Sequence, residues 1–258
     1  MITSFTFTIG AFYGLAPKLD NPHAWLAWRN QPFALEKQAE LSLAHVPASL
    51  KRRSSTVVKL ALETAFECLS RNINTASQSI DYTIFASQHG ESSKLQALLK
   101  QILHKEMLSP VDFSQSVHNT ASGLFSLAKS ITTNVNSIAA GRDTFLIAFL
   151  EALTYLRLHP DSRLVLVSYD ECLPVCYETY AVQYDQQYAC AFSLHNQVED
   201  CCDSIKCTLE LTVKPEEQQA EELDNLPALD FVAWLCDSAD KSLRLSSAFW
   251  RFNWYKKS

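Results

Sequence analysis

The sequence predicts an α/β fold in which a central mixed sheet is flanked by helices and one helix is buried. Three observations support this fold class. Residues 143–157 (DTFLIAFLEALTYLR) are apolar at ten of fifteen positions and have no continuous polar face, which is typical of a helix that is covered on all sides. Short β-type runs precede and follow this helix at residues 134–140 and 163–169. Strand, helix and strand in this order form a βαβ unit, and a fully covered helix needs a second layer of protein against it.

Length and composition indicate a globular protein with a large core. The chain has 258 residues, of which 47% are hydrophobic and 19% are charged. We expect one domain over residues 1–258, because the sequence contains no internal repeat and no low-complexity linker. A net charge of −6 argues against nucleic acid or an anionic membrane as the main partner.

The N-terminus and the cysteines predict the compartment. The first sixteen residues (MITSFTFTIGAFYGLA) lack a basic region and are too short and too rich in hydroxyl groups for insertion into a membrane. The eight cysteines are scattered, and no CxxC pair occurs. We therefore expect a cytoplasmic protein with reduced thiols.

Strands and helices alternate in the first half of the predicted fold. The strands, rich in β-branched and aromatic residues, are residues 4–13 and 79–87. The helices, with apolar side chains at three- and four-residue steps, are residues 56–72, 92–106 and 120–131. A serine cap precedes the first of these helices, and a loop is expected to begin at Pro110. Residues 14–50 are expected to be irregular, apart from a short helix near residues 34–44.

The last third of the chain has a different character. Residues 188–195 and 204–213 are predicted to be the two strands of a hairpin. Residues 214–225 (KPEEQQAEELDN) are charged, and we expect them to be solvated. A helix over residues 229–239 and an aromatic, β-like run over residues 247–255 complete the chain.

Three segments resemble the N-terminal half of the β-ketoacyl synthases. They are PASLKRR at residues 47–53, SVHNTASG at residues 116–123 and SIAAGRDTFLIAFLEAL at residues 137–153. More narrowly, they resemble the short ketosynthase-like proteins of aryl polyene gene clusters, which act as chain-length factors. The resemblance extends over most of residues 1–213 and is most specific between SVHN and the buried helix. It implies a truncated thiolase-like fold, one half of a family whose two halves repeat the same five-stranded α/β/α topology.

The resemblance also implies that the catalytic residues are missing. In the family, a nucleophilic cysteine stands at the turn before the buried helix, where the helix N-terminus lowers the pKa of the thiol. Counting from Asn119 without gaps places Arg142 at that turn, and a guanidinium cannot accept an acyl group. The two catalytic histidines of the family belong to its C-terminal half, to which the resemblance does not extend. We therefore expect a pseudo-ketosynthase without catalytic residues, cofactor or metal. An alternative for Arg142 is an ion pair with Asp143 or Asp170.

The resemblance implies a heterodimer with an active β-ketoacyl-ACP synthase, which elongates an acyl chain on acyl carrier protein. In the family, the strand before the nucleophile turn pairs with its mate across a two-fold axis, and that strand is residues 134–140 here. The preceding loop would reach the partner's acyl tunnel, where we expect Val111, Phe113 and Val117 to set the floor, although ordinary core positions are an equally good interpretation. The expected interface residues are Ser116, His118, Asn119, Asn134, Asn136 and Ile138.

Three cations, Lys51, Arg52 and Arg53, stand just ahead of the helix over residues 56–72. Cations at a helix N-terminus oppose the macrodipole, so their placement there is mildly unfavourable. Two interpretations stay open. One is a solvated surface, and the other is contact with an acidic partner such as acyl carrier protein.

The main alternative function is a stand-alone acyltransferase or thiolase-like enzyme that uses Cys68 or Cys172 as its nucleophile. Other constellations give weak signals. The histidines show no HxxxH or HExxH spacing, and the cysteine spacings match no standard zinc site. No GxSxG, P-loop or GxGxxG motif occurs, so the sequence does not support a serine hydrolase or a nucleotide-binding protein.

Overall fold

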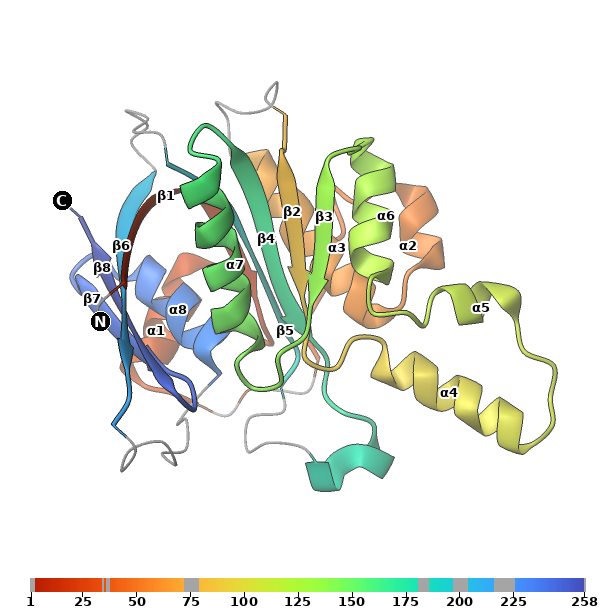
Figure 1. Ribbon diagram of the computed structural model, residues 1–258. Coiled ribbons are helices and arrows are strands. Elements are labelled where there is room, and N and C mark those ends of the chain that lie inside the picture. The colour runs from red at the N-terminus through yellow and green to blue at the C-terminus, as the bar shows by residue number, and fades with distance from the viewer. Residues whose placement is uncertain are drawn as a thin grey trace.

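The computed structural model describes residues 3–33, 35, 38–71, 79–180, 186–196, 204–215 and 226–257. An eight-stranded sheet with the order β3-β2-β4-β5-β1-β6-β8-β7 forms the centre of the molecule (Figure 1). Its strands are β1 (Thr3–Leu15), β2 (Tyr82–Ala86), β3 (Asn134–Ile138), β4 (Arg163–Asp170), β5 (Tyr188–His195), β6 (Ile205–Val213), β7 (Ser242–Ser246) and β8 (Trp250–Lys256). The helices are α1 (Pro22–Asn30), α2 (Ala48–Arg53), α3 (Thr56–Arg71), α4 (Ser92–Leu103), α5 (Pro110–Ser114), α6 (Thr120–Lys129), α7 (Thr144–Leu158) and α8 (Pro227–Cys236), with a short 3₁₀ helix at Val175–Tyr180.

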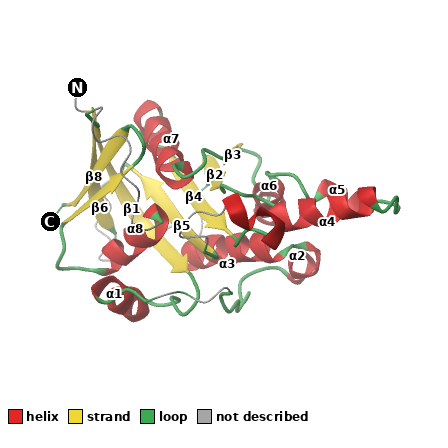
Figure 2. Cartoon of the chain, turned by 90° about the horizontal axis from the view of Figure 1, so that it is seen from below, coloured by secondary structure: helices red, strands yellow, loops and turns green. Residues whose placement is uncertain are grey.

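The sheet is mixed, as the sequence predicts. Strands β2, β3 and β4 are parallel, because helices α6 and α7 connect them, whereas β5 is antiparallel to β4 and to β1. Helices α3 and α6 cover one face and α7 covers the other, so the sheet lies between two helical layers (Figures 1 and 2). The fold class predicted from the sequence is therefore confirmed.

The C-terminal part of the chain supplies the second layer over α7. Phe149 of α7 packs its ring against Phe231 of α8 at 4.9 Å and against Trp254 of β8 at 5.1 Å, measured between ring centroids. Lys256 donates two hydrogen bonds of 2.6 Å to the carbonyls of Trp234 and Asp237, which satisfy the C-terminal end of α8. Two aromatic residues of the run at residues 247–255, Phe252 and Trp254, are thus part of the core of this chain.

The predicted hairpin is wrong, although its two strands are correct. Strand β1 lies between β5 and β6 and pairs antiparallel with both of them. The thirteen residues of β1 are long enough for this: residues Thr3–Ile9 pair with β6, and residues Thr8–Leu15 pair with β5. Adjacency in the sequence does not decide which strands become neighbours.

The helix expected near residues 34–44 does not form in the described part of that stretch. Side chains from distant elements bind its backbone instead. The amide of Ala39 donates to Gln187 Oε1 at 2.6 Å, and the amide of Leu43 donates to the carboxylate of Glu63. The helix of this region is α1, which begins after Asn21, whose side chain accepts a 3.0 Å hydrogen bond from the amide of Ala24.

Two further predictions need correction. Pro110 begins helix α5 rather than a loop, because Ser109 caps the helix through a 3.3 Å hydrogen bond from the amide of Asp112. Lys51, Arg52 and Arg53 are the last residues of helix α2, so they complement its macrodipole instead of opposing that of α3. Ser55 caps α3 as expected, through a 3.2 Å hydrogen bond from the amide of Val58.

The predicted solvated segment at residues 214–225 lies mostly outside the described residues, and Lys214 at its start is buried. In the part of the chain that the structure describes, no helix is long and apolar enough to cross a membrane.

Helices α4 and α5 form an arm, residues 92–114, that projects from the sheet (Figures 1 and 2). The prediction of an amphipathic helix at residues 92–106 is confirmed for Ser92–Leu103. Its apolar face is exposed, however, because among the leucines of α4 only Leu98 is buried. An apolar helix face without protein against it is unusual in a monomer and points to a contact with another molecule.

Candidate functional site

The turn between β3 and α7 is built around Thr144 and Gly141. The Thr144 hydroxyl donates to the carbonyl of Gly141 at 2.7 Å and accepts from the amide of Ala140 at 2.9 Å. Gly141 has a φ of +57°, a conformation that a residue with a side chain adopts only with strain. Five residues separate the end of β3 from the start of α7. The residue that follows Gly141 therefore lies between the C-terminal end of β3 and the N-terminus of α7.

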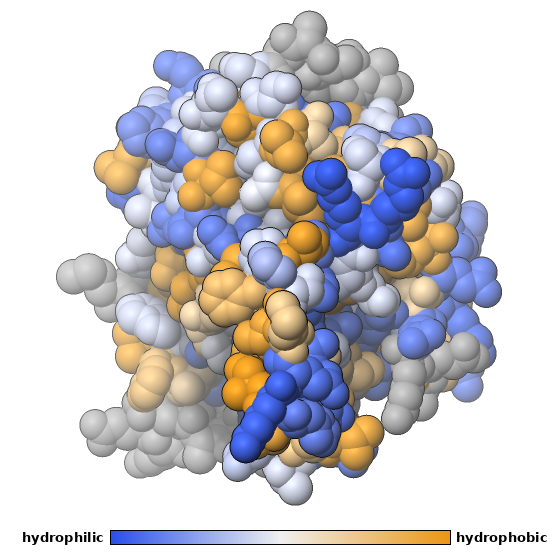
Figure 3. Space-filling model, turned by 90° about the vertical axis from the view of Figure 1, so that its right-hand side faces the viewer, coloured by the Kyte–Doolittle hydropathy of each residue, from blue (hydrophilic) through white to orange (hydrophobic). Residues whose placement is uncertain are grey.

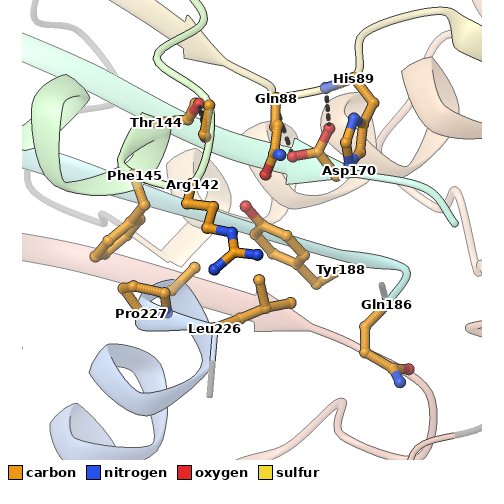
Figure 4. Close-up of a pocket in the computed structure, with 12 residues that line it drawn as sticks. Gln88, His89, Arg142, Thr144, Phe145, Asp170, Gln186, Tyr188, Leu226 and Pro227 are labelled. Carbon is orange, nitrogen blue, oxygen red and sulfur yellow. Dashed lines mark hydrogen bonds between the residues drawn. The ribbon is translucent and has the colours of Figure 1, made fainter. Parts of the chain in front are cut away.

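That residue is Arg142, as the resemblance implies. Its side chain extends across a pocket toward Tyr188, Leu226 and Pro227 (Figure 4). The free volume of the pocket is about 20 Å³, which suffices for one water molecule and not for an acyl chain. The pocket beside the turn is therefore small, and Arg142, which is exposed, stands at its edge.

Arg142 does not form the ion pairs considered as its structural alternative. Among the described residues, no salt bridge within 4.0 Å joins it to Asp143 or Asp170. Asp170 is instead occupied by the end of β2: it accepts hydrogen bonds from the Ser87 hydroxyl at 2.6 Å and from the amides of Gln88 and His89 at 2.9 Å each (Figure 4). Burial raises the pKa of Asp170, and these hydrogen bonds act in the opposite direction.

His118 joins the predicted interface segment to the same strand end. Its Nε2 atom lies 2.8 Å from the carbonyl oxygen of Ser87. Gly90 leaves room for this contact, since a Cβ atom there would lie 3.0 Å from the imidazole ring. Ser116 and His118 are half-buried, whereas Asn119 is exposed at the start of α6. His118 thus holds the segment against the end of β2.

The predicted tunnel residues lie at the end of the arm and just after it. Val111 and Phe113 belong to α5 and are 60% and 62% exposed, and Val117 follows at 45%. They are not core positions of this chain, so that interpretation is excluded. They continue the exposed apolar surface of α4, and Figure 3, which faces the arm, shows hydrophobic side chains gathered there beside hydrophilic ones. We call this set the arm surface; it comprises Leu95, Leu99, Ile102, Leu103, Val111, Phe113 and Val117.

Strand β3 is an edge strand among the described residues, because it pairs only with β2. Asn134 is exposed, and Asn136 and Ile138 are half-buried. Helix α6 lies behind β3, where the hydroxyls of Ser122 and Ser137 are 3.0 Å apart. The outer edge of β3 presents backbone N–H and C=O groups that can pair with another strand.

The candidate thiols differ in their accessibility. Cys68 is fully buried, and burial raises its pKa to about 12, so it stays protonated and out of contact with any substrate. Cys172 is half-buried after the end of β4 and does not line the pocket at Arg142. Within the described part of the chain, no group of three or more His, Cys, Asp or Glu side chains could hold a metal ion.

Sequence reasoning missed the residues that close the pocket and the residue that begins the arm. Tyr188 and Leu226 reach the pocket from β5 and from the start of α8, and no local pattern relates them to Arg142. Glu91 stands before α4 with only 6% of its surface exposed and accepts a 2.7 Å hydrogen bond from Ser55. Burial raises the pKa of Glu91 to about 7. The signal for it was a carboxylate directly before an amphipathic helix.

The profile of the β-ketoacyl synthase N-terminal domain matches residues 25–255, which is most of the chain. The chain belongs to the β-ketoacyl synthase N-terminal domain family. A search of curated proteins gives no significant match.

Solved structures of β-ketoacyl synthases and related subunits share the fold. One is a ketosynthase in complex with its chain length factor from Xenorhabdus doucetiae, with 23% identity over 97% of this chain and 99% of the matched chain and a TM-score of 0.78. One chain from the structure of a type II polyketide acyl carrier protein in complex with its ketosynthase is also similar. The match covers 98% of this chain and 99% of that chain, with 9% identity and a TM-score of 0.70. The ishigamide ketosynthase/chain length factor matches 83% of this chain and 69% of its own, with 12% identity and a TM-score of 0.63. These likenesses show that this β-ketoacyl synthase domain shares its fold with the three solved structures.

Proposed function

We propose that this chain is a non-catalytic chain-length-factor subunit, which pairs with an active β-ketoacyl-ACP synthase and shapes its acyl tunnel in aryl polyene biosynthesis. The observation that carries the proposal is the turn before α7. Arg142 stands there without a thiol, over a pocket that holds about one water molecule. A guanidinium stays protonated and cannot become an acyl acceptor, so the chain contributes to condensation through its partner.

The exposed surface supports a pairing role. The arm surface carries seven large apolar side chains, each more than a third exposed, and a surface of this kind is stable when another protein covers it. The edge of β3 offers a second element that a partner strand can extend. Strand-to-strand pairing at β3 places the arm over the partner, since Ser116–Asn119 links the arm to α6 behind β3.

Within this proposal, Val111, Phe113 and Val117 reach the partner's tunnel. Side chains that project from a neighbouring chain can shorten a tunnel without taking part in the chemistry. Bulk at the floor limits product length, because forcing extra methylene groups into a tight cavity costs about 1–3 kcal/mol. Lys51, Arg52 and Arg53 at the end of α2 are proposed to contact acyl carrier protein, as two of them are exposed and none forms an ion pair with a described carboxylate.

The stand-alone enzyme is disfavoured by the burial of Cys68, and Cys172 is its remaining nucleophile. Co-expression with a β-ketoacyl-ACP synthase separates the two functions. We expect a stable one-to-one pair, in which a labelled acyl thioester modifies only the partner. Acylation of this chain at a catalytic rate, or condensation by this chain alone, would contradict the proposal. Cys172→Ala identifies the nucleophile in that case.

The Phe113→Ala variant tests the tunnel directly. We expect longer products with a largely unchanged condensation rate, because the truncation enlarges the floor and leaves the partner's catalytic residues in place. Leu158→Ala is the matched control, since Leu158 is 71% exposed at the end of α7 and belongs neither to the arm surface nor to the proposed tunnel. Product lengths are measured by mass spectrometry of the carrier-bound acyl chains. An unchanged length in Phe113→Ala, with the pair intact, would remove Phe113 from the tunnel.

A further inference from the structure

A groove lies beside the second half of β1, away from the turn at Arg142 and from the arm. Its volume is about 480 Å³, within the range of small-molecule sites. Elements β1, α1, α3 and α8 form its walls, which include Phe12, Tyr13, Trp25, Arg71, Val232 and Cys236. The groove is thus mostly apolar, and Arg71 at the end of α3 supplies the cation among the described residues that line it.

The strand pairing explains why the groove is open. Strand β6 accompanies β1 only as far as Ile9, and a bulge between Ile9 and Ala11 then redirects β1. Beyond the bulge, the strands that the structure describes accompany β1 only on the β5 side. Alternate residues of an antiparallel strand direct their backbone groups to each side, so this free edge presents N–H and C=O groups to the groove. The carbonyl of Gly14 is one of them and accepts a 3.2 Å hydrogen bond from Trp25 Nε1.

Arg71 is oriented but only loosely paired. Its guanidinium lies 4.4 Å from the centroid of the Tyr13 ring, a cation–π contact that fixes the plane of the group. Its nearest described carboxylate, that of Glu67, is 3.9 Å from Nε and also lies 3.3 Å from His45. Among the described residues, Arg71 donates no side-chain hydrogen bond. A fixed guanidinium with free donors binds a carboxylate through two parallel hydrogen bonds.

We propose that this groove binds a small carboxylic acid with an apolar body, whose carboxylate pairs with Arg71. The body of the ligand lies against the half-buried side chains of Phe12, Tyr13 and Cys236, where burial of apolar surface supplies the affinity. The acidic side chains nearby select the head group. Asp20 at the rim and Glu67 beside Arg71 repel a doubly charged phosphate more strongly than a singly charged carboxylate. The site does not depend on the proposed chain-length function, because it shares no residue with the turn or the arm.

Calorimetric titration of octanoate into the full chain, alone or co-purified with its partner, tests the proposal. We expect saturable binding that weakens about tenfold to a hundredfold in Arg71→Gln, the loss of a charge-assisted bidentate contact. Arg157→Gln removes an exposed cation on α7 that also lies over an aromatic ring, that of Phe5, and is outside the groove, so it should bind octanoate within about twofold of the unaltered chain. Both variants carry the same partner, so octanoate that the partner binds contributes equally to each titration.

A second variant tests the shape of the groove independently of the charge of Arg71. Ser70 is exposed and lines the groove, so Ser70→Phe fills the groove without altering the core. We expect it to lose octanoate binding while Arg71 is intact, and we expect octanol, which lacks the carboxylate, to bind the unaltered chain as weakly as octanoate binds Arg71→Gln. No saturable binding by the unaltered chain overturns the proposal. Equal octanoate binding by Arg71→Gln or by Ser70→Phe, or equal binding of octanol and octanoate by the unaltered chain, overturns it as well.

Discussion

Helices α7 and α4 are both rich in apolar residues, yet one is enclosed and the other is exposed. Eight side chains of α7 are buried, whereas α4 buries Leu98 alone. The difference lies in what the chain supplies to each helix. Helix α8 and strand β8 close over α7, and no described element closes over the outer face of α4. The chain completes the core around α7 by itself and leaves the outer face of α4 exposed.

The largest expected effect comes from removing the cover of α7. Trp254 is fully buried in β8 and contacts the rings of Phe7, Phe149 and Phe231. We expect Trp254→Ala to lower the free energy of unfolding by about 3–5 kcal/mol, because it leaves a large cavity between α7 and α8. Denaturation by urea, followed by circular dichroism, measures the change.

Tyr255→Ala is the control for that variant. Tyr255 is the next residue of β8, points away from the core and is 39% exposed. We expect this change to cost no more than about 1 kcal/mol. Equal losses in the two variants would show that β8 does not cover α7 as described.

On the arm, we expect a substitution to weaken pairing with a partner and to leave the stability of the chain unchanged. Leu99 is 42% exposed on the outer face of α4, so Leu99→Asp should leave the free energy of unfolding unchanged within about 0.5 kcal/mol. In the proposed pair the same carboxylate would be buried without a partner, and we expect assembly to weaken about thirtyfold to a hundredfold. Size-exclusion chromatography with light scattering measures the pairing.

Ala97→Asp introduces the same carboxylate on the opposite side of α4, where Ala97 is exposed. Pairing should weaken by less than threefold in this variant. If Leu99→Asp pairs as well as Ala97→Asp, the arm surface is not part of the interface.

The two helices also show how far the sequence could predict the structure. The burial of α7 was predictable, since an apolar helix between two strands has one place in an α/β fold. The identity of its cover was not, because contacts such as Phe149 with Trp254 join distant parts of the chain and no local pattern encodes them. The apolar face of α4 was equally visible in the sequence, but periodicity shows only that a face will be covered. It does not show whether the same chain covers it.

In the candidate site too, the local sequence predicted the turn, whereas the residues that reach it from distant parts of the chain could not be predicted. The resemblance implies that Arg142 stands at the turn before the buried helix, and the structure has Arg142 in the turn between β3 and α7. Its correspondence to the family's nucleophile stays a prediction. Tyr188 reaches the pocket from β5, whose pairing with β1 and β4 differs from the predicted hairpin, and Leu226 reaches it from the start of α8. Helix α1 was missed because its nine residues show little apolar periodicity, although Asn21 followed by Pro22 is a typical helix start.

The smallest expected effect is a pH dependence of stability at the base of the arm. It tests whether Glu91, just before α4, is buried while the outer face of α4 is exposed. Glu91 begins the arm in a buried position, and burial raises its pKa to about 7 from an ordinary value of 4.5. The Ser55 hydroxyl and the nearby charge of Lys94 lower this pKa, and the charge of Glu171 raises it. Because the folded chain holds the proton more tightly than the unfolded chain, this stability is full below about pH 4.5 and is lost as the pH rises through 7.

We therefore expect the free energy of unfolding to fall by about 1–2 kcal/mol between pH 5 and pH 7 on account of Glu91. Glu91→Gln keeps the hydrogen bond from Ser55 and removes the titration, so this part of the pH dependence should disappear. Glu106→Gln removes an exposed carboxylate just beyond α4 and should leave the pH dependence unchanged. Urea denaturation across this pH range measures all three proteins. If the free energy of unfolding depends on pH equally in Glu91→Gln and in the unaltered chain, Glu91 is ionised in the folded state across this range. The base of the arm would then be accessible to water, as its apolar face is.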